Sequence, residues 1–509
     1  MSTQRTADET AATGETAGEA ASRSAAGEAA SRTADERTAD ERTADASGAA
    51  DGPRAASVPG AAEVPRAADA SEAAEQATAA RAAAVVVELA GRLADPEAVV
   101  AVATAEGNLD RQPGRSPLHP WGGVTLAEGH PGVALLFAEL AQEDPRHRAR
   151  AHAHLAAAAR SLSAGQGAGL YTGPPALALA ACAARRGPAD YATLLDRLDA
   201  QVDSRVRQLI DAENERLAAR RAGVSMDVYD LILGLAGIGR YLLLRADRHR
   251  DALTDTLSYL VRLTEPVRHL GHTVPGWWVP DAPGLGQEAH FPRGHFNLGL
   301  AHGVCGPLAL FALAEEAGVS VPGQREAATR IVDWLLSRQS ADLSWPAVVG
   351  WDDETACARP GPAQGRTAWC YGTPGVAHTV YLAGRAWDRG DWRQTATEAL
   401  ASSLDGPQSL VDCGLCHGWS GLLQIACRMA RDSRDERLLA QLPGLAERVL
   451  ADYDPALPLG YRYADTPPGL WAPHRAGFLE GTAGIALSLH TYASGATPRT
   501  PWDAALLLA

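Results

Sequence analysis

Three residues in the second half of the chain have side chains that could bind a metal ion together. Cys416 and His417 are adjacent, and Cys370 stands at the matching place in the preceding copy of a repeat described below. Zinc binds thiolates and imidazoles, and two cysteines with one histidine leave its fourth position open. An open position is what a catalytic zinc needs. Cys370, Cys416 and His417 therefore predict a catalytic Zn²⁺ site.

The remaining cysteines do not extend this set. Cys413 forms Cys-x-x-Cys with Cys416, which is typical of a redox pair or of half a structural zinc site. The chain has no second Cys-x-x-Cys, so we leave Cys413 outside the metal shell. Seven cysteines without a secretory signal argue against a disulfide framework. We interpret four others as small buried apolar residues of helices: Cys182, Cys305, Cys357 and Cys427.

Two titratable residues stand at corresponding places in other copies of the repeat. His302 titrates near neutral pH and could move a proton to or from a reacting centre. The alternative is a histidine that only forms hydrogen bonds in the core. Asp230 could orient a histidine or help to deprotonate a thiol, or it could be the N-cap of a helix. The sequence leaves these alternatives open.

A short glycine motif recurs through the chain, with two glycines three residues apart that lead into an aliphatic run. The starts are 44 to 69 residues apart (129 to 173 and 303 to 372), which is room for about two helices. The copies are Gly129-His-Pro-Gly132, Gly234-Leu-Ala-Gly237, Gly303-Val-Cys-Gly306, Gly372-Thr-Pro-Gly375, Gly418-Trp-Ser-Gly421 and Gly481-Thr-Ala-Gly484, with a degenerate seventh at Gly173-Pro-Pro-Ala176.

The glycine pair has a physical reason. Glycine just ahead of a helix lets the backbone turn sharply and lets neighbouring helix ends approach closely. The run that follows, as in residues 238–244, is then a buried inner helix. Helical hairpins that repeat must cover their apolar faces by stacking on neighbours. The candidate site residues all precede such starts, so we expect them to converge at one mouth of the stack.

Composition favours an all-α fold. The chain has 509 residues, 46% hydrophobic but only 6% aromatic, and alanine and leucine dominate the apolar set. The formal net charge is -15, which argues against nucleic-acid binding. No apolar run approaches the ~20 residues of a membrane helix. We expect a cytoplasmic protein without an integral membrane segment.

The N-terminal part differs in kind from the rest. Residues 1–78 carry almost no large apolar side chains, and the unit Arg-Thr-Ala-Asp begins at Arg5, Arg32, Arg37 and Arg42. Such a segment buries too little surface to offset the entropy of ordering. We predict a disordered tail over 1–78 and one domain over 79–509.

Several of these motifs together resemble the lanthionine synthetase C-like (LanC) cyclases. They are Asn297-Leu-Gly-Leu-Ala-His302-Gly, Arg366-Thr-Ala-Trp-Cys370-Tyr371-Gly372, Cys416-His417-Gly418 and the glycine repeats. The resemblance implies an α/α toroid of seven inner and seven outer helices with zinc at one mouth. It places the metal ligands at Cys370, Cys416 and His417 and the catalytic residues at His302, Asp230, Arg366 and Tyr371.

The resemblance also implies an activity. Such a zinc-dependent cyclase adds cysteine thiols of a dehydrated precursor peptide to dehydroalanine or dehydrobutyrine, which forms lanthionine or methyllanthionine rings by Michael-type addition. Only a predicted tail precedes the toroid, so we expect a stand-alone cyclase that works with a separate dehydratase. Two alternatives remain. One is a zinc toroid that prenylates proteins, where an aspartate would replace one cysteine. The other is a non-catalytic LanC-like protein that binds thiols such as glutathione or acts as a scaffold.

Overall fold

The computed structural model describes residues 67–111, 116–163, 169–284, 286–357, 367–406, 410–464 and 472–509. In this part of the chain, long helices alternate between an inner and an outer layer. The seven inner helices are α4 (His130–Leu140), α6 (Pro174–Ala184), α9 (Leu235–Leu244), α11 (Cys305–Glu316), α14 (Thr373–Ala386), α16 (Trp419–Ser433) and α18 (Thr482–Ser494). The seven outer helices are α2 (Ala67–Arg92), α5 (His147–Ser161), α7 (Ala192–Ala218), α10 (Arg250–Leu263), α12 (Gln324–Ser337), α15 (Gly390–Asp405) and α17 (Glu436–Ala451).

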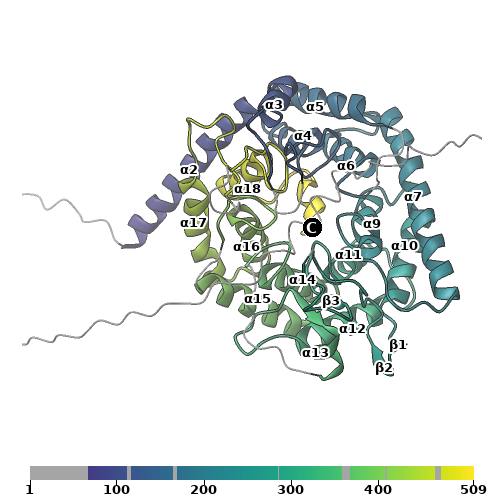
Figure 1. Cartoon of the computed structure of the whole chain (residues 1–509). Helices are drawn as coiled ribbons and strands as arrows, with labels where there is room; N and C mark the ends of the chain where they lie inside the picture. Colours follow the sequence, from purple (N-terminus) through teal and green to yellow (C-terminus); the bar gives the residue numbers. More distant parts are fainter. Residues whose placement is uncertain are drawn as a thin grey trace, which may run out of the picture.

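The inner helices close into a ring. Each contacts the next in chain order, and the last, α18, contacts the first, α4. The outer helix α2 packs against α18 and α17, so the first and last long helices of the described residues lie side by side at the closure (Figure 1). The α/α toroid with seven inner and seven outer helices is thereby confirmed for the described residues.

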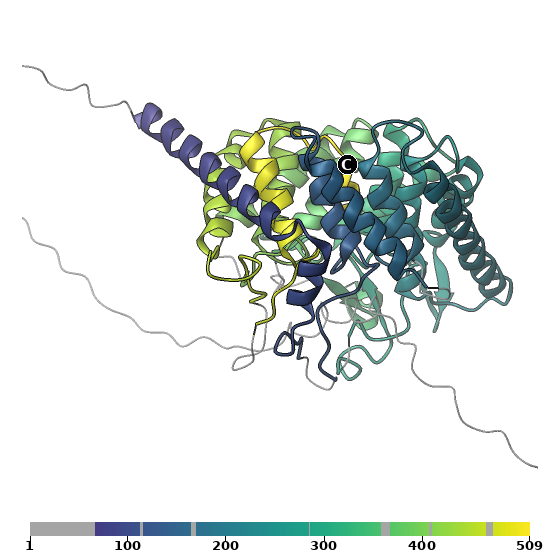
Figure 2. The ribbon, with the colours of Figure 1, turned by 90° about the horizontal axis from the view of Figure 1, so that it is seen from above.

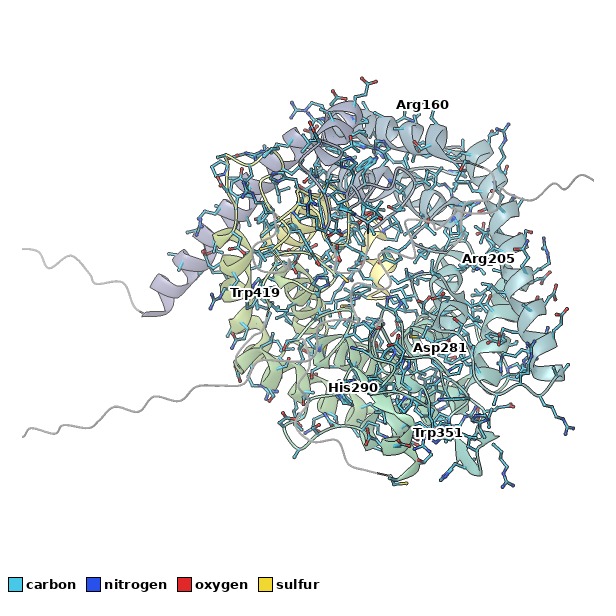
Figure 3. All side chains as sticks on the ribbon, viewed as in Figure 1. Arg160, Arg205, Asp281, His290, Trp351 and Trp419 are labelled. Carbon is cyan, nitrogen blue, oxygen red and sulfur yellow. The ribbon has the colours of Figure 1, made fainter. Side chains whose placement is uncertain are left out.

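The two layers differ in which residues they expose. All eleven residues of α4 are buried, as expected of a helix surrounded by other helices. On the outer helix α10, Leu253, Leu257 and Leu260 recur at helical spacing and are fully buried, whereas Asp251 is exposed. Figure 3 shows Arg160 of α5 and Arg205 of α7 on the outer layer. The core therefore lies between the layers and within the inner ring.

The glycine motif marks places where the chain folds back on itself. A Cβ atom at Gly237, Gly421 or Gly484 would lie 1.8, 2.0 or 1.8 Å from the carbonyl oxygen of the residue six positions earlier. The loop before each of these helices therefore packs directly on its first turn. The degenerate copy keeps this role with other residues: Gly173 adopts φ 69°, and two prolines follow in the first turn of α6, where a missing N–H is tolerated.

Backbone hydrogen bonds join the loops before the inner helices into a closed circle, which we call the loop ring. Each loop donates to the next, so the loops hold one another at one end of the inner helices. The bonds are Leu126 N to Tyr171 O (3.0 Å), Tyr171 N to Ile232 O (3.2 Å), Leu231 N to Ala301 O (3.0 Å), Ala301 N to Cys370 O (3.4 Å), Cys370 N to Cys416 O (3.1 Å), Cys416 N to Leu479 O (2.8 Å) and Phe478 N to Leu126 O (3.2 Å).

The C-terminal segment fills the centre of the ring. The 3₁₀ helix η1 (Trp502–Leu506) contacts α4, α6 and α9 and lies centrally in Figure 1. Tyr171 donates its hydroxyl to the Ala505 carbonyl (2.7 Å), and the Trp369 indole donates to the Leu506 carbonyl (3.0 Å). Both donors belong to loops of the loop ring. The C-terminal segment around η1, which we call the plug, and the loop ring therefore hold each other in place.

Four short β-strands were not expected from a composition that favours an all-α fold. The strands β1 (Val267–His269) and β2 (His272–Val274) pair antiparallel, as do β3 (His295–Asn297) and β4 (Val348–Gly350). They lie in the connections around α11 and α12, where β-branched and aromatic residues favour extended backbone. Three short helices complete the fold: α3 (Pro96–Ala103), α8 (Met226–Tyr229) and α13 (Trp351–Thr355).

At the N-terminal end, α2 begins at Ala67, so the expected boundary between residues 78 and 79 falls within a helix. Thr78 is buried and donates to Glu447 of α17 over 2.7 Å. Figure 2 shows the first turns of α2 extending beyond the ring. Residues 1–66 of the expected tail lie outside the described residues. None of the described helices is long and apolar enough to cross a membrane.

The close approach at the glycine motif leads to a stability prediction. Gly484→Ala places a methyl group against the Phe478 carbonyl, so we expect a loss of about 1–3 kcal/mol or more in unfolding free energy. Gly444→Ala is the matched control, because Gly444 lies within α17 with no atom near its Cβ position. We expect this control to gain about 0.5–1 kcal/mol. Urea unfolding measures both, and equal stability of the two variants contradicts the packing role of the motif.

Candidate active site

The three predicted metal ligands lie together. The ligand atoms of Cys370, Cys416 and His417 all lie within 4.8 Å of one another, and the three side chains are buried. Zinc–sulfur bonds of about 2.3 Å in a tetrahedral shell place two sulfur atoms roughly 3.8 Å apart. The spacing of the cluster is therefore close to what one shared ion requires.

The loop ring accounts for this convergence. Cys370 precedes α14, whereas Cys416 and His417 precede α16. The amide of Cys370 donates to the carbonyl of Cys416 (3.1 Å), and the amide of Cys416 donates to Leu479 (2.8 Å). Two loops from separate repeats are thus held side by side by their main chains. The thiols reach one another because their backbones are already joined.

The electrostatics of the cluster favour a cation. The neighbouring Cys370 thiol and burial together raise the pKa of Cys416 well above its ordinary value. Burial lowers the pKa of His417, but the negative charge of Asp412 and a hydrogen bond with Cys370 outweigh it and raise this pKa to about 9. The pocket therefore favours positive charge and resists a second thiolate. A divalent cation supplies that charge and stabilises both thiolates, so the donor set fits zinc.

One ring nitrogen of His417 has polar partners outside the cluster of thiols. Its Nε2 lies 2.8 Å from the hydroxyl oxygen of Tyr463 and 3.4 Å from Asp412 Oδ2. Nδ1 is therefore the candidate ligand atom. Sequence reasoning missed both neighbours. A signal existed for Asp412, because Asp412-x-Gly414 stands before His417 as Asn297-x-Gly299 stands before His302.

A second polar pair lies in neighbouring loops. His302 Nδ1 lies 2.7 Å from Asp230 Oδ2, and both side chains are buried. Asp230 Oδ1 also accepts from the amides of Leu233 (2.8 Å) and Gly234 (2.7 Å), just before α9. Burial lowers the pKa of His302, but the hydrogen bond and charge of Asp230 outweigh it and raise the pKa. Asp230 therefore both holds the histidine and braces the turn into α9.

Tyr371 lies beside this pair. Its ring is stacked at 6.1 Å from the His302 ring, and its hydroxyl oxygen accepts from Asn297 Nδ2 (3.2 Å). Asn297 is fixed in turn, because its Oδ1 accepts from the amide of Gly299 (2.9 Å). Burial raises the pKa of Tyr371, which keeps the phenol protonated at neutral pH. Asn297 was not predicted as a site residue, and Arg366 lies outside the described residues.

Comparison with known proteins agrees with this geometry. The family model described as lanthionine synthetase C-like protein matches residues 120–507, which is most of the chain. This chain belongs to the lanthionine synthetase C-like family.

Individual relatives of this LanC-like protein span most of its length. It is 26% identical over 402 residues to the nisin biosynthesis protein NisC of Lactococcus lactis subsp. lactis, covering 76% of this chain and 90% of that protein. Among solved structures it resembles nisin cyclase with a TM-score of 0.64 and 26% identity, covering 76% of this chain and 92% of the other. The residues that the family model matches, 120–507, include all seven inner helices.

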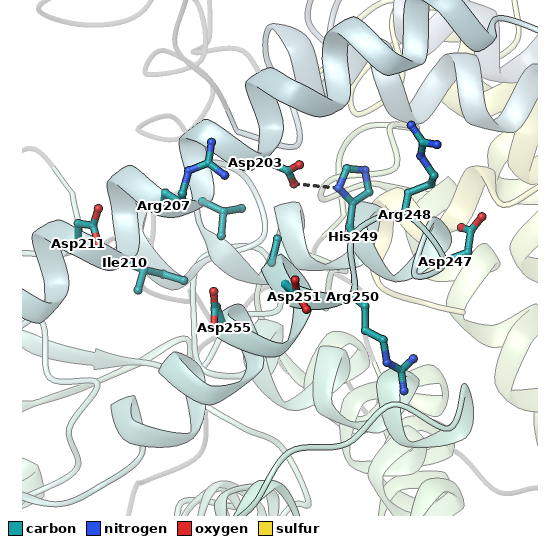
Figure 4. Close-up of a pocket in the computed structure, with 12 residues that line it drawn as sticks. Asp203, Arg207, Ile210, Asp211, Asp247, Arg248, His249, Arg250, Asp251 and Asp255 are labelled. Carbon is teal, nitrogen blue, oxygen red and sulfur yellow. Dashed lines mark hydrogen bonds and ion pairs between the residues drawn. The ribbon is translucent and has the colours of Figure 1, made fainter.

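The LanC-like protein has a further pocket, of about 500 Å³, away from this cluster. It lies between the outer helices α7 and α10 (Figure 4) and has charged residues of both signs, including Asp203, Arg207 and Asp251. His249 at its edge is paired with Asp203 (2.8 Å). None of the candidate site residues lines it, so the metal cluster at the loop ring remains the candidate active site.

The two contacts of Asp230 can be separated by mutation. In Asp230→Asn the amide oxygen can still accept from Leu233 and Gly234, so we expect stability near that of the wild type. Asp230→Ala leaves both amides without this partner, one of them buried. We expect it to lose about 2 kcal/mol or more. Chemical unfolding followed by circular dichroism measures both, and an alanine variant as stable as the asparagine variant contradicts the bracing role.

Proposed function

We propose that this LanC-like protein is a zinc-dependent lanthipeptide cyclase. It forms lanthionine and methyllanthionine rings by adding cysteine thiols of a precursor peptide to dehydroalanine and dehydrobutyrine in the same peptide. The cluster of Cys370, Cys416 and His417 carries the proposal, because its open shell suits activation of a thiol. The similarity to nisin cyclase supports the same reaction class.

The three ligands would hold one zinc ion. When bound, zinc acidifies a coordinated substrate thiol and holds it as thiolate near neutral pH. The two cysteines and the histidine leave room for that thiol in the fourth position. Burial of all three side chains excludes water from the protein side of the cluster.

His302 is the proposed proton donor. His302 Nδ1 is hydrogen-bonded to Asp230, so Nε2 is the nitrogen left to face the substrate. As the thiolate sulfur bonds to the β-carbon of the dehydroamino acid, the double bond electrons move to the carbonyl oxygen. His302 then gives a proton to the α-carbon as the enolate electrons reform the carbonyl and make the new C–H bond. The proton released by the thiol passes to solvent, from which His302 is reprotonated. Asp230 favours the charged imidazole that this step requires.

Tyr371 and Arg366 are proposed to stabilise the enolate. The protonated phenol of Tyr371 stands next to His302, and Asn297 fixes its position. A donor held in place before the reaction stabilises developing negative charge without reorganisation. The role of Arg366 is assigned from the family resemblance alone.

The proposed reaction defines the partners. The substrate is a dehydrated precursor peptide, so serine and threonine dehydration is assigned to a separate dehydratase. We place both steps in the cytoplasm. We further propose that the cyclase domain begins with α2, at Ala67, and extends through residue 509, so it starts earlier than the boundary after residue 78 that the sequence suggested.

Zinc content tests the metal site. We expect about one zinc per wild-type chain and loss of most of it in Cys416→Ala, because two ligands do not retain the ion well. Cys427→Ala is the matched control, since Cys427 is buried in α16 outside the cluster. It should keep its zinc. Elemental analysis of purified protein measures all three, and full occupancy in Cys416→Ala removes the central claim.

His302→Asn tests the proton transfer. We expect this variant to keep its zinc and fold while ring formation slows by ~10²–10⁴-fold, the usual contribution of a general acid or base. Mass spectrometry after thiol alkylation of a dehydrated precursor peptide gives the rate, with peptide alone as the background. Zinc loss would instead place His302 in the metal shell. If wild-type protein binds thiols but does not exceed the background, the non-catalytic thiol-binding alternative is favoured.

A further inference from the structure

The candidate metal ligand His417 contacts a residue from the connection that leads into the next inner helix, α18. Tyr463 lies in the connection between α17 and α18, and its hydroxyl oxygen is 2.8 Å from His417 Nε2. The two rings meet edge to face, with centroids 5.8 Å apart. Tyr463 is buried. This contact fixes the rotation of the imidazole about its bond to the chain.

Tyr463 is itself clamped by a buried arginine. The guanidinium of Arg475 lies 4.2 Å from the centroid of the Tyr463 ring, a cation–π contact. The amide of Tyr463 also donates to the carbonyl of Pro473 (2.9 Å), which brings the two chain segments together. The ring face and the backbone amide of Tyr463 are both held, so its hydroxyl oxygen is kept in place beside His417.

Arg475 is held by carboxylates from three parts of the chain. It lies 2.6 Å from Glu480, 2.9 Å from Asp110 and 3.1 Å from Glu128. Its side chain is 5% exposed. Moving a buried guanidinium away from such partners leaves uncompensated charges and is strongly unfavourable. Arg475 is therefore held in place more firmly than a surface arginine. Because its guanidinium packs on the Tyr463 ring, it also restricts the position of that ring.

We propose that Tyr463, clamped by Arg475, is a positioning residue for the metal centre. It accepts the Nε2–H of His417 and so presents Nδ1 to the ion. Ligating histidines usually donate their other N–H to an acceptor outside the metal shell, most often a carboxylate, a backbone carbonyl or water, and loss of the acceptor typically costs about 10–100-fold in metal affinity. The hydroxyl oxygen of Tyr463 occupies this place. The inference rests on the proposed function only for the identity of the ion. Asp412 Oδ2 lies farther from Nε2, at 3.4 Å, than the Tyr463 hydroxyl oxygen at 2.8 Å, so Tyr463 is the nearer acceptor.

Zinc affinity of the full-length chain tests the inference. Tyr463→Phe keeps the ring over Arg475 and removes only the hydroxyl, so we expect zinc to bind about 10–100-fold more weakly. Tyr461→Phe is the matched control, because the Tyr461 hydroxyl is also buried but donates to the Val449 carbonyl (3.0 Å). It should bind zinc like the wild type. Competition with a chromogenic chelator gives the dissociation constants.

A spectroscopic measurement separates positioning from a general effect on folding. The absorption spectrum of the cobalt(II)-substituted protein reports the ligand field at the ion, and we expect it to change in Tyr463→Phe but not in Tyr461→Phe. Wild-type affinity and spectrum in Tyr463→Phe would overturn the inference alone. Equal weakening in both variants would also overturn it. Failure of the wild type to bind zinc would overturn the proposed function together with the inference.

Discussion

The loop ring is the interaction on which the rest of the structure depends. Each loop can donate to its neighbour only if all seven inner helices begin at the same level, and the close packing at Gly237, Gly421 and Gly484 keeps them there. Because Cys370 and Cys416 are members of this circle, their separation is a property of the toroid. Side chains contribute the chemistry, but the main chain decides where it is located.

Orientation of the active groups comes from a second set of positions. Asn297, Asp412 and Arg475 occupy the same place in their repeats, since each carbonyl accepts from the amide seven residues later, over 2.9, 3.0 and 3.0 Å. Asn297 supports Tyr371, Asp412 approaches His417, and Arg475 supports Tyr463. The repeat thus supplies both a place for each reactive side chain and a place for its support.

The sequence predicted what is local or periodic. The toroid and the cluster of Cys370, Cys416 and His417 could be predicted because equivalent repeat positions must meet at one end of a ring. For Asp230, the structure shows the expected contact with a histidine, His302, whereas the N-cap of α9 is Gly234 and not Asp230. Tyr463 and Arg475 were missed because their partners are distant: Tyr463 is 46 residues from His417, and Arg475 is 365 residues from Asp110. No motif records such pairs.

The plug formed by η1 determines how a long substrate can reach the site. Trp502 and residues 504–508 are buried, and Tyr171 and Trp369 hold the segment across the middle of the toroid. The centre of the toroid is therefore closed to a peptide, unlike the central pore of an unfoldase. For the proposed peptide substrate, each thioether must form while the chain lies across a single face. The sequence of ring closures then depends on lateral shifts or release and recapture, and a finished macrocycle never has to pass a constriction.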